Sequence, residues 1–471
     1  MAKPRSSGAR SRSFLKVALT AVVVIAFATA CSQLGGTSRT PNVVLVVIDT
    51  LRADHLGCYG YERPTSPNID AFAAQATRYS RALSAGAWTV PSHASLFTGK
   101  PPFAHGARTF RVDEPTNNVS PLAEAEVTLA EALLQSGYRT GAFVANAAYL
   151  SQKWNLDQGF ESWTVARVYA DELNPLVFTW LDAAAEAHDP FFLFVNYIDV
   201  HGPYDTRPRL DVTDEPVDRD PDLMHVLAKR VLPADEDIPT EIVRRVIDQY
   251  DTAISNVDAG IGALLDRIES LGLDEDTIVI LTSDHGEYFG EHYLAAHSKD
   301  VYQEVLRVPL LIRAPRQQAG RLVERLTVSN DVPGLIASEF PKDARARLLA
   351  LFPKLPGNHV VVAENYYTRQ KDLFHPLWGH RFQRERRAVF EWPYKLIISS
   401  DDQHELYDLE ADPSESNNLL ERRPQIAERL ATSLRAYEDA RGRREPQRRS
   451  GPAQIDGALL NNLKALGYVE E

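Results

Sequence analysis

The 471-residue sequence contains only two cysteines, Cys31 and Cys58. If Cys31 is acylated, Cys58 is the only thiol left, and no intramolecular disulfide can form even in an oxidising compartment. We therefore expect Cys58 to be a small packed residue. A catalytic thiol is the alternative interpretation.

The chain also lacks an apolar run long enough to span a bilayer. The uncharged stretch 17–30 is shorter than the roughly 20 residues that a spanning helix needs. Five basic residues and no acidic residue precede it, so residues 1–30 are predicted to be a signal peptide. Ala28-Thr29-Ala30 before Cys31 resembles a lipoprotein cleavage box.

These features predict an exported lipoprotein, anchored to a membrane through Cys31 and facing the periplasm or the cell exterior. Residues 31–41 would then be the lipidated cysteine and a Gly-, Ser- and Thr-rich tether. An ordinary signal cut near Ala30, which would leave a free cysteine, is the alternative.

The sequence has fewer basic than acidic residues, with 51 Lys and Arg against 64 Asp and Glu, so its formal net charge is −13. A strongly acidic protein is a poor nucleic-acid binder, so no nucleic-acid partner is expected. An anionic substrate would have to be attracted locally, by a metal and a helix end. With 44% hydrophobic residues, the chain can bury a large α/β domain and one smaller unit.

Three apolar runs are each followed by polar groups. Residues 42–48 end at Asp49, residues 191–198 lead to His201, and residues 277–281 lead to Asp284 and His285. Continuous apolar runs indicate strands buried on both faces of a parallel sheet, and ligands bind beyond the carboxyl ends of such strands.

Helical patterns alternate with these runs, at residues 69–79 with Asn68 as the N-cap, at 122–136 and at 241–271. The alternation predicts the α/β class, with a doubly wound, mainly parallel sheet. We assign residues 42–350 to this catalytic domain and residues 205–240, rich in Pro and Asp, to an insertion or lid.

The pattern changes after about residue 350. Short strand candidates and a charged helix at 424–441 indicate a small antiparallel α+β subdomain over residues 351–441. Residues 442–471 are predicted to be a basic linker and a short helical tail.

One threonine lies at the centre of the strongest motif, Trp88-Thr89-Val90-Pro91-Ser92-His93. Pro91 suits the first turn of a helix, which places the Thr89 hydroxyl at the helix N-terminus. The free N–H groups and the positive dipole end there favour an anionic substrate or a developing alkoxide.

Residues 49–60 together with residues 91–99 resemble the sulfatase family of the alkaline-phosphatase superfamily, and the resemblance extends over roughly residues 41–430. It implies an alkaline-phosphatase-like fold. Most sulfatases carry Cys, sometimes Ser, two residues before this Pro and convert it to formylglycine. Thr89 stands there, and His93 replaces the usual Arg. Threonine is not a known substrate of that conversion, but it is the nucleophile in phosphoethanolamine- and glycerophosphate-transferring branches.

The resemblance implies that Asp49, Thr89, Asp284 and His285 bind one divalent metal, with Mn, Ca, Mg and Zn all compatible with these ligands. Taken singly, Asp49 could cap a helix, and Asp284-His285 could form a turn. Superfamily members with two metals carry an Asp-x-x-x-His element, which this chain lacks. We therefore expect a single-metal site.

Three further residues are catalytic candidates: His201, His297 and Lys299. His201 matches the family histidine near the leaving group and is assigned general acid or substrate contact. His297 and Lys299 are expected to contact anionic oxygens. The alternatives are a turn or helix-capping role for His201 and a surface salt bridge for Lys299.

Other departures from the sulfatase sequence pattern favour a phosphorus ester as the substrate. Thr50 stands where sulfatases have a second Asp, and His285 stands where they have Asn. Asn146-Ala147-Ala148 stands where they carry Lys-x-His. The expected function is metal-dependent hydrolysis of phosphate, phosphonate or sulfate esters through a covalent Thr89 intermediate, acting on a small anionic ester or a glycan or lipid head group. The alternatives are an arylsulfatase-type hydrolase, a phosphotransferase to a soluble acceptor, and a non-catalytic lipid-anchored binding protein.

Overall fold

The computed structural model describes residues 40–207, 212–213, 216–352 and 360–442. The predicted signal peptide, Cys31 with most of the tether, and the tail from residue 443 lie outside the described residues. The chain divides into two compact units, 1–40 and 41–471, and the fold below is that of the second. None of its described helices combines the length and the hydropathy of a bilayer-spanning segment.

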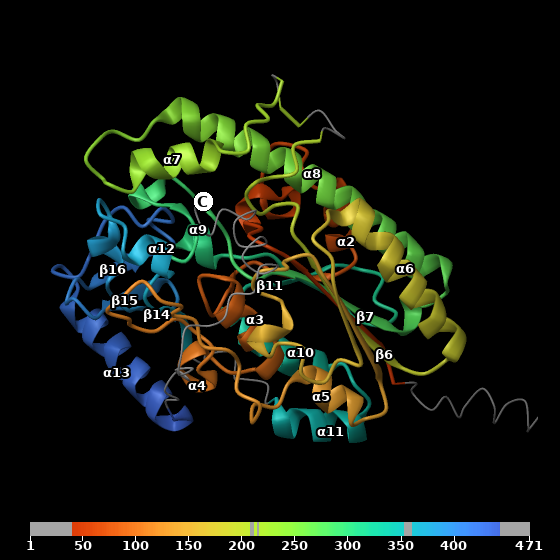
Figure 1. The fold of residues 1–471 in the computed structure, drawn as a ribbon. Coiled ribbons are helices and arrows are strands. Elements are labelled where there is room, and N and C mark those ends of the chain that lie inside the picture. Colours follow the sequence, from red (N-terminus) through yellow and green to blue (C-terminus); the bar gives the residue numbers. More distant parts are fainter. Residues whose placement is uncertain (1–39, 208–211, 214–215, 353–359, 443–471) are drawn as a thin grey trace, which may run out of the picture. The chain divides into compact units, whose positions relative to one another are not determined.

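An eight-stranded sheet with the order β11-β2-β10-β7-β1-β6-β4-β5 forms the centre of this unit (Figure 1). Strands β1 (Asn42–Ile48), β6 (Phe191–Tyr197) and β4 (Arg139–Val144) run parallel to β7 (Thr277–Ser283), while β10 (Leu310–Arg313) is antiparallel to it. Every residue of β1, β6 and β7 is buried, as their continuous apolar runs predict. The expected mainly parallel sheet is confirmed.

Helices cover both faces of this sheet (Figure 1). On one side lie α2 (Pro67–Ala73), α6 (Ala170–Ala187) and α8 (Thr240–Ser270). On the other lie α3, α5, α10 and α11, with the bounds Thr89–Thr98, Leu129–Leu134, Val332–Ser338 and Lys342–Leu351. The doubly wound arrangement is therefore confirmed, and it brings the carboxyl ends of β1 and β7 to one edge.

Short elements complete the large unit. They are β2 (Thr77–Tyr79), β3 (Ala82–Leu83), α4 (Pro102–His105), β5 (Ser162–Val165), α7 (Leu223–Val231), β8 (Tyr288–Phe289), the 3-10 turn η5 (Glu291–Tyr293), β9 (Ala295–Ala296), α9 (Gln303–Leu306), β11 (Arg321–Val323), β12 (Thr327–Val328) and α12 (Gln370–Leu373).

Near the end of the chain, a four-stranded antiparallel sheet has the order β13-β14-β15-β16. Its strands are β13 (Val361–Asn365), β14 (Arg386–Glu391), β15 (Tyr394–Ser399) and β16 (Glu405–Asp408), and α13 (Pro424–Arg441) packs on it. This confirms the predicted small antiparallel sheet. The backbone N–H of Glu364 donates to the carbonyl of Ala85 at 2.9 Å, so the sheet is joined to the loop before Thr89.

The predicted helix over residues 69–79 is wrong in its bounds. Pro67 takes the first position of α2, the helix ends at Ala73, and residues 77–79 form β2 between β10 and β11. Asn68 is not the N-cap. Its side-chain amide instead donates to Asp258 on α8 at 2.8 Å, so a tertiary contact determines its position.

Two other segments also differ from expectation. The helix expected over residues 122–136 is limited to α5, because Thr128 and Glu131 form a capping box that starts it there. Residues 205–240, expected to be an insertion or lid, include the helix α7. The helix expected over residues 241–271 is present as α8.

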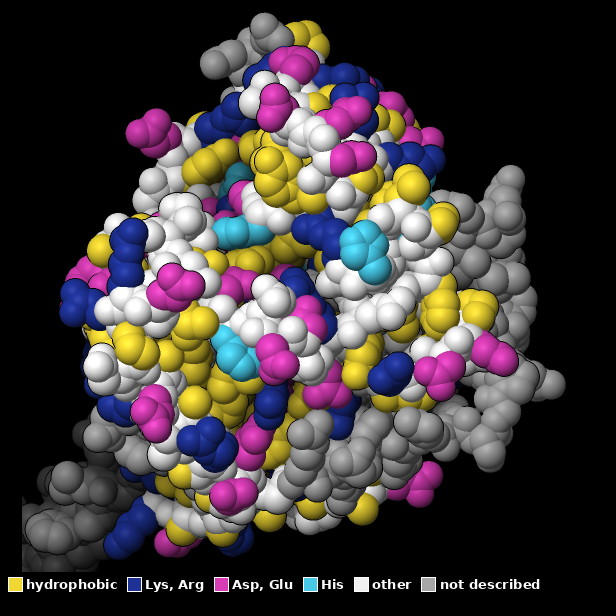
Figure 2. All heavy atoms as spheres, turned by 90° about the vertical axis from the view of Figure 1, so that its left-hand side faces the viewer, with side chains coloured by type: hydrophobic (Ala, Val, Ile, Leu, Met, Phe, Trp, Pro, Cys, Tyr) yellow, Lys and Arg dark blue, Asp and Glu magenta, His cyan; other side chains and the backbone are white. Residues whose placement is uncertain are grey.

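Opposite charges alternate over the molecular face in Figure 2, where Asp and Glu side chains lie among Lys and Arg. On this face the coloured side chains form no continuous field of one sign. An anionic substrate approaching it would depend on the local charges of a binding site.

The buried Glu364 of β13 gives the first testable expectation. Its carboxylate accepts hydrogen bonds from the Phe103 N–H at 2.8 Å and from the Tyr366 hydroxyl at 2.9 Å, yet burial raises its pKa to about 7. Between the ordinary glutamate pKa and that value, the folded state holds a proton that the unfolded state releases. This residue's contribution to stability therefore falls as pH rises through that window.

Because glutamine mimics the protonated acid, Glu364→Gln should gain stability relative to wild type between pH 5 and pH 8, by at most about 3 kcal/mol. Urea unfolding midpoints at the two pH values measure the difference. The exposed Glu391→Gln on β14 is the control and should show no such trend. An equal difference at both pH values for Glu364→Gln would contradict the expectation.

Candidate active site

Two carboxylates meet at the ends of the central strands. Because β1 and β7 pair in register up to Ile48 and Ser283, Asp49 and Asp284 leave the sheet side by side. Asp49 Oδ2 accepts a hydrogen bond from the Asn146 side-chain amide at 2.7 Å, and Asp284 Oδ1 accepts from the backbone N–H of His285 at 2.9 Å. Asp49 Oδ1 and Asp284 Oδ2 are fully buried and have no hydrogen-bond partner.

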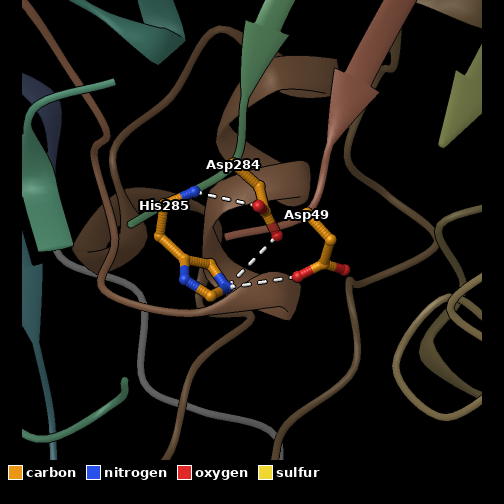
Figure 3. Close-up of side chains that lie close together, drawn as sticks. All are labelled: Asp49, Asp284 and His285. Atoms are coloured by element: carbon orange, nitrogen blue, oxygen red, sulfur yellow. Dashed lines mark hydrogen bonds and ion pairs between the residues drawn. The ribbon is translucent and has the colours of Figure 1, made fainter. Parts of the chain in front are cut away.

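The His285 imidazole faces these two oxygens (Figure 3). Its Nδ1–H donates to the carbonyl of Gly286 at 2.9 Å, and its Nε2 lies 3.3 Å from Asp284 Oδ2 and 3.7 Å from Asp49 Oδ1. Gly286 makes this turn possible, because a Cβ there would lie 2.0 Å from the Glu304 carbonyl oxygen. Three ligand-type atoms therefore converge within 4.8 Å of one another.

Thr50 supports the pair of carboxylates from a strained backbone. Its φ of 61° is unfavourable for a β-branched residue and costs on the order of 1–3 kcal/mol. In this conformation its N–H donates to Asp284 Oδ1 at 3.2 Å, while its hydroxyl donates to the Val200 carbonyl at 2.6 Å. Thr50 thus orients Asp284 through its backbone.

Thr89 is the first residue of α3, and its Oγ1 is buried without a hydrogen-bond partner. Pro91 occupies the first turn, as expected. The Thr89 carbonyl accepts a hydrogen bond from the Nδ1–H of His93 at 2.9 Å, and the same nitrogen lies 3.6 Å from Asp284 Oδ2. The His93 ring therefore links the start of α3 to the two carboxylates.

Burial perturbs each titratable group in this centre. Desolvation and the neighbouring Asp49 charge raise the pKa of Asp284 well above its usual value, and desolvation raises that of Asp49. Burial also holds the pKa of His285 well below its usual value and lowers that of His93 to about 4. Two buried carboxylates beside neutral imidazoles form a site that a cation would stabilise.

A second pair of histidines lines the centre. The His297 ring lies 4.5 Å from the His285 ring and 5.1 Å from the His201 ring, measured between centroids. Its Nδ1–H donates to Glu287 Oε1 at 2.8 Å, and the Tyr204 hydroxyl contacts Glu287 Oε2 at 3.4 Å. Burial raises the pKa of Glu287 to about 7 and lowers that of His297.

His201 faces an open cavity of about 290 Å³, lined also by Arg167, Tyr169 and Glu172. The His201 Nδ1–H donates to the carbonyl of Gly202 at 2.7 Å, which fixes the ring orientation. Burial lowers the pKa of His201. Of the two histidines, His201 is the one that lines this cavity.

Lys299 forms a salt bridge, as its alternative interpretation expected, but the pair is buried and not at the surface. Its Nζ lies 3.0 Å from Asp372 Oδ2 in α12 and donates to the His297 carbonyl at 3.3 Å. Although burial opposes ionisation, the Lys299 charge brings the pKa of Asp372 down to about 2. The described structure thus brings all seven sequence-predicted site residues into one region, with Lys299 held by an acidic partner that the sequence did not indicate.

Comparison with known proteins decides the family. The family model described as Sulfatase matches residues 41–338, which is more than half of the chain. The chain belongs to the sulfatase family. The protein is therefore an ester hydrolase of the alkaline-phosphatase superfamily, to which sulfatases belong.

Individual sulfatase relatives are distant. The chain is 26% identical to an ulvan-active sulfatase of Formosa agariphila over 81% of this chain and 77% of that protein. It is 24% identical to an N-acetylgalactosamine-6-O-sulfatase of Bacteroides thetaiotaomicron over 87% of this chain and 96% of that protein. The fold matches a phosphonate monoester hydrolase of Agrobacterium radiobacter with a TM-score of 0.64 at 20% identity, covering 85% of this chain and 96% of that one.

Several residues in this sulfatase-family site were not predicted. Asn146 lies in the region where the Lys-x-His of sulfatases is absent. Only the structure shows that its side-chain amide donates a hydrogen bond to Asp49. Glu287 directly follows the Asp284-His285-Gly286 motif, so its position was a usable signal. Asp372 comes from α12, almost ninety residues after the motif, and no local pattern connects it to Lys299.

Cys58 is half-buried, and its pKa is raised to about 12 by burial and by Asp70. A thiol with so high a pKa is a poor nucleophile at neutral pH. These properties favour the packed role expected for Cys58 over a catalytic one.

Proposed function

We propose that this sulfatase-family protein is a metal-dependent hydrolase that attacks anionic esters with Thr89 and prefers phosphate or phosphonate esters to sulfate esters. The observation that carries the proposal is the buried, unpartnered Thr89 Oγ1 at the N-terminus of α3. The resemblance places this hydroxyl at the position that formylglycine occupies in most sulfatases. No other hydroxyl of that motif combines this position with an unpartnered oxygen: Ser92 hydrogen-bonds to Gly86.

The residues at this centre fit a divalent metal. Asp49 Oδ1, Asp284 Oδ2, His285 Nε2 and Thr89 Oγ1 are all buried and all lack hydrogen-bond partners. Leaving such atoms unpaired costs roughly 1–3 kcal/mol each, which a shared cation would offset. When bound there, one metal would lower the pKa of the Thr89 hydroxyl and polarise an ester oxygen.

Thr89 would act as the nucleophile, its Oγ forming a bond to phosphorus while the bond from phosphorus to the leaving oxygen breaks. The proton of the Thr89 hydroxyl passes to Nε2 of a neutral imidazole, which delivers it to the leaving oxygen. His297 and His201 are the candidates, because their rings lie next to the centre and the Nδ1–H of each donates within the protein, which makes Nε2 the basic nitrogen of the neutral ring. Water then cleaves the phosphothreonine and restores the hydroxyl.

This second step distinguishes threonine from formylglycine. A formylglycine hydrate can expel its ester by collapsing to an aldehyde, whereas a threonine ester must be hydrolysed by attack on phosphorus. We therefore expect the second step to be slow enough for the covalent ester to accumulate.

The preference for phosphorus rests on the resemblance to known branches of the family. Asn146-Ala147-Ala148 stands where sulfatases carry a sulfate-contacting Lys-x-His, and Asp284-His285 resembles the phosphate-handling branches. Sulfate esters are the second candidate, because two relatives are named as an ulvan-active sulfatase and an N-acetylgalactosamine-6-O-sulfatase. A sulfated glycan would then be the substrate class.

A substrate panel tests the proposed preference. Purified protein is assayed with p-nitrophenyl phosphate, a phosphonate monoester, a phosphodiester and p-nitrophenyl sulfate at equal concentrations. We expect the highest kcat/KM for a phosphorus ester. A higher kcat/KM for the sulfate would overturn the preference and favour the sulfatase alternative.

We also propose that Cys31 is acylated and anchors the enzyme to a membrane facing the periplasm or exterior. The support is the sequence before Cys31, because these residues lie outside the described structure. Wild type should incorporate a labelled fatty acid in cells, and Cys31→Ser should not. Cys58→Ser is the matched control and should label like wild type; equal labelling of Cys31→Ser and wild type would contradict the anchor.

A further inference from the structure

A second cavity, of about 330 Å³, lies where the loop after β2, helix α9 and the turn between β14 and β15 meet. None of the candidate active-site residues lines it. Its polar lining residues are Ser80, Arg81, Gln303 and Arg307, and the other described residues of the lining are a tryptophan and aliphatic residues. No aspartate or glutamate is among them. The lining therefore carries two positive charges, in a protein whose formal net charge is −13.

Arg307, the residue directly after α9, is a half-buried cation in this lining. Among the described residues, its guanidinium makes no hydrogen bond and no ion pair. Its charge acts on Asp54, but that carboxylate already accepts two hydrogen bonds from Arg52, at 3.0 and 2.7 Å. A guanidinium offers five N–H donors in a planar fork that matches an oxyanion. Arg307 is therefore available to an anion in the cavity.

Gln303, the first residue of α9, adds a buried donor to the lining. Its Nε2 has no hydrogen-bond partner among the described residues. The acid that contacts Gln303 is Glu415, which accepts from its backbone N–H at 2.7 Å and pairs with the Lys395 ammonium at 2.5 Å. That carboxylate is thus already neutralised. A buried amide without an acceptor is unfavourable, and an acceptor on a ligand would satisfy it.

Arg81 and Trp392 form a packed pair in the lining. The Arg81 guanidinium lies 3.9 Å from the centroid of the Trp392 ring and donates to the Glu324 carbonyl at 2.8 Å. These contacts hold the Arg81 charge at the cavity and do not neutralise it, because neither partner is an acid. The Trp392 ring and the buried Leu409 give the cavity an apolar wall beside its two cations.

We propose that this cavity binds a small organic anion. The oxyanion group of the ligand pairs with Arg307 and Gln303, and its apolar body packs against Trp392 and Leu409. The volume of about 330 Å³ lies within the range of small-molecule sites and exceeds what a single inorganic oxyanion fills. The site is separate from the active-site residues and does not depend on Thr89 being the nucleophile.

The position of the cavity links its occupant to the support of the active site. Gln303 begins α9 and Arg307 directly follows it, so a ligand bonded to both residues spans this helix. Within α9, the Val305 carbonyl accepts a hydrogen bond from the N–H of Gly286 at 2.8 Å, and Gly286 directly follows His285. An anion that binds the folded state here should therefore raise the melting temperature.

Calorimetric titration of the full-length protein tests this site. Benzoate, benzenesulfonate and phenylphosphonate share a ring and differ in their oxyanion, and benzamide is the neutral analogue. We expect at least one of the three anions to bind with a Kd below about 10 mM and to raise the melting temperature. Benzamide should bind more weakly than that anion, and the anion that binds best identifies the preferred oxyanion. Failure of all three anions to bind, or equal binding of benzamide, would overturn the proposal.

Substitutions then locate the bound anion. Arg307→Gln removes a charge but no hydrogen bond within the described structure, and it should weaken binding of the best anion by about ten- to a hundredfold. Gln303→Met should weaken it as well. Arg321→Gln on β11 is the matched control, because Arg321 also makes no ion pair among the described residues but does not line the cavity.

This control and Asp284→Asn, which alters the active site, should both keep the wild-type affinity. Wild-type affinity in Arg307→Gln would refute the site. Loss of binding in Asp284→Asn would refute it too, because the anion would then occupy the active site.

Discussion

Replacing Thr89 by alanine should lower kcat by at least about a thousandfold, the scale seen when a covalent nucleophile is removed. The reason is geometric. Thr89 Oγ1 is buried at the N-terminus of α3, and no hydrogen bond within the protein uses it. Removing it therefore breaks no native hydrogen bond, and the loss should appear in turnover rather than in stability.

Two further variants separate chemistry from folding. Thr89→Ser keeps a hydroxyl and should retain measurable turnover. Thr98→Ala, at the other end of α3, removes a buried hydroxyl that bonds the Ala94 carbonyl at 2.6 Å, and it should leave kcat within a few-fold of wild type. Turnover by Thr89→Ala equal to that of Thr98→Ala would show that another group attacks the substrate.

Asp284→Asn should lower kcat/KM by at least about a hundredfold and remove one divalent metal equivalent from the active site, because a neutral amide is a weaker ligand than a carboxylate. Asp284 Oδ1 is held by the N–H groups of Thr50 and His285, so only Oδ2 is directed to the convergent atoms.

Elemental analysis of protein purified in parallel checks the metal content. Asp258→Asn is the control, since Asp258 is also a buried aspartate but hydrogen-bonds to α2. It should keep the wild-type metal content. Unchanged metal content in Asp284→Asn would contradict the assigned ligands, and loss of two equivalents from the active site would indicate a binuclear centre.

Much of the fold was predictable because burial and hydrophobic pattern agree. The runs that became β1, β6 and β7 are apolar throughout, and each is followed by a polar group at the edge where parallel strands meet. Asp49, His201 and the pair Asp284-His285 could therefore be grouped from sequence alone.

What could not be predicted depends on contacts between distant segments. Asn68 would be an ordinary helix cap by sequence, but Asp258 on α8 binds its amide. The Asp372 partner of Lys299 comes from a C-terminal segment, and no local periodicity links it to the catalytic domain. Such pairings arise only when the two segments pack together.

The covalent ester on Thr89 is the central claim of this account, and mass spectrometry tests it most directly. The enzyme is mixed with excess p-nitrophenyl phosphate, quenched in acid within the first turnovers, and digested. We predict a phosphate adduct on the peptide that contains Thr89, mapped to that residue and absent from Thr89→Ala. An active enzyme that carries no adduct on Thr89 at any quench time, or carries it on another residue, would contradict the account.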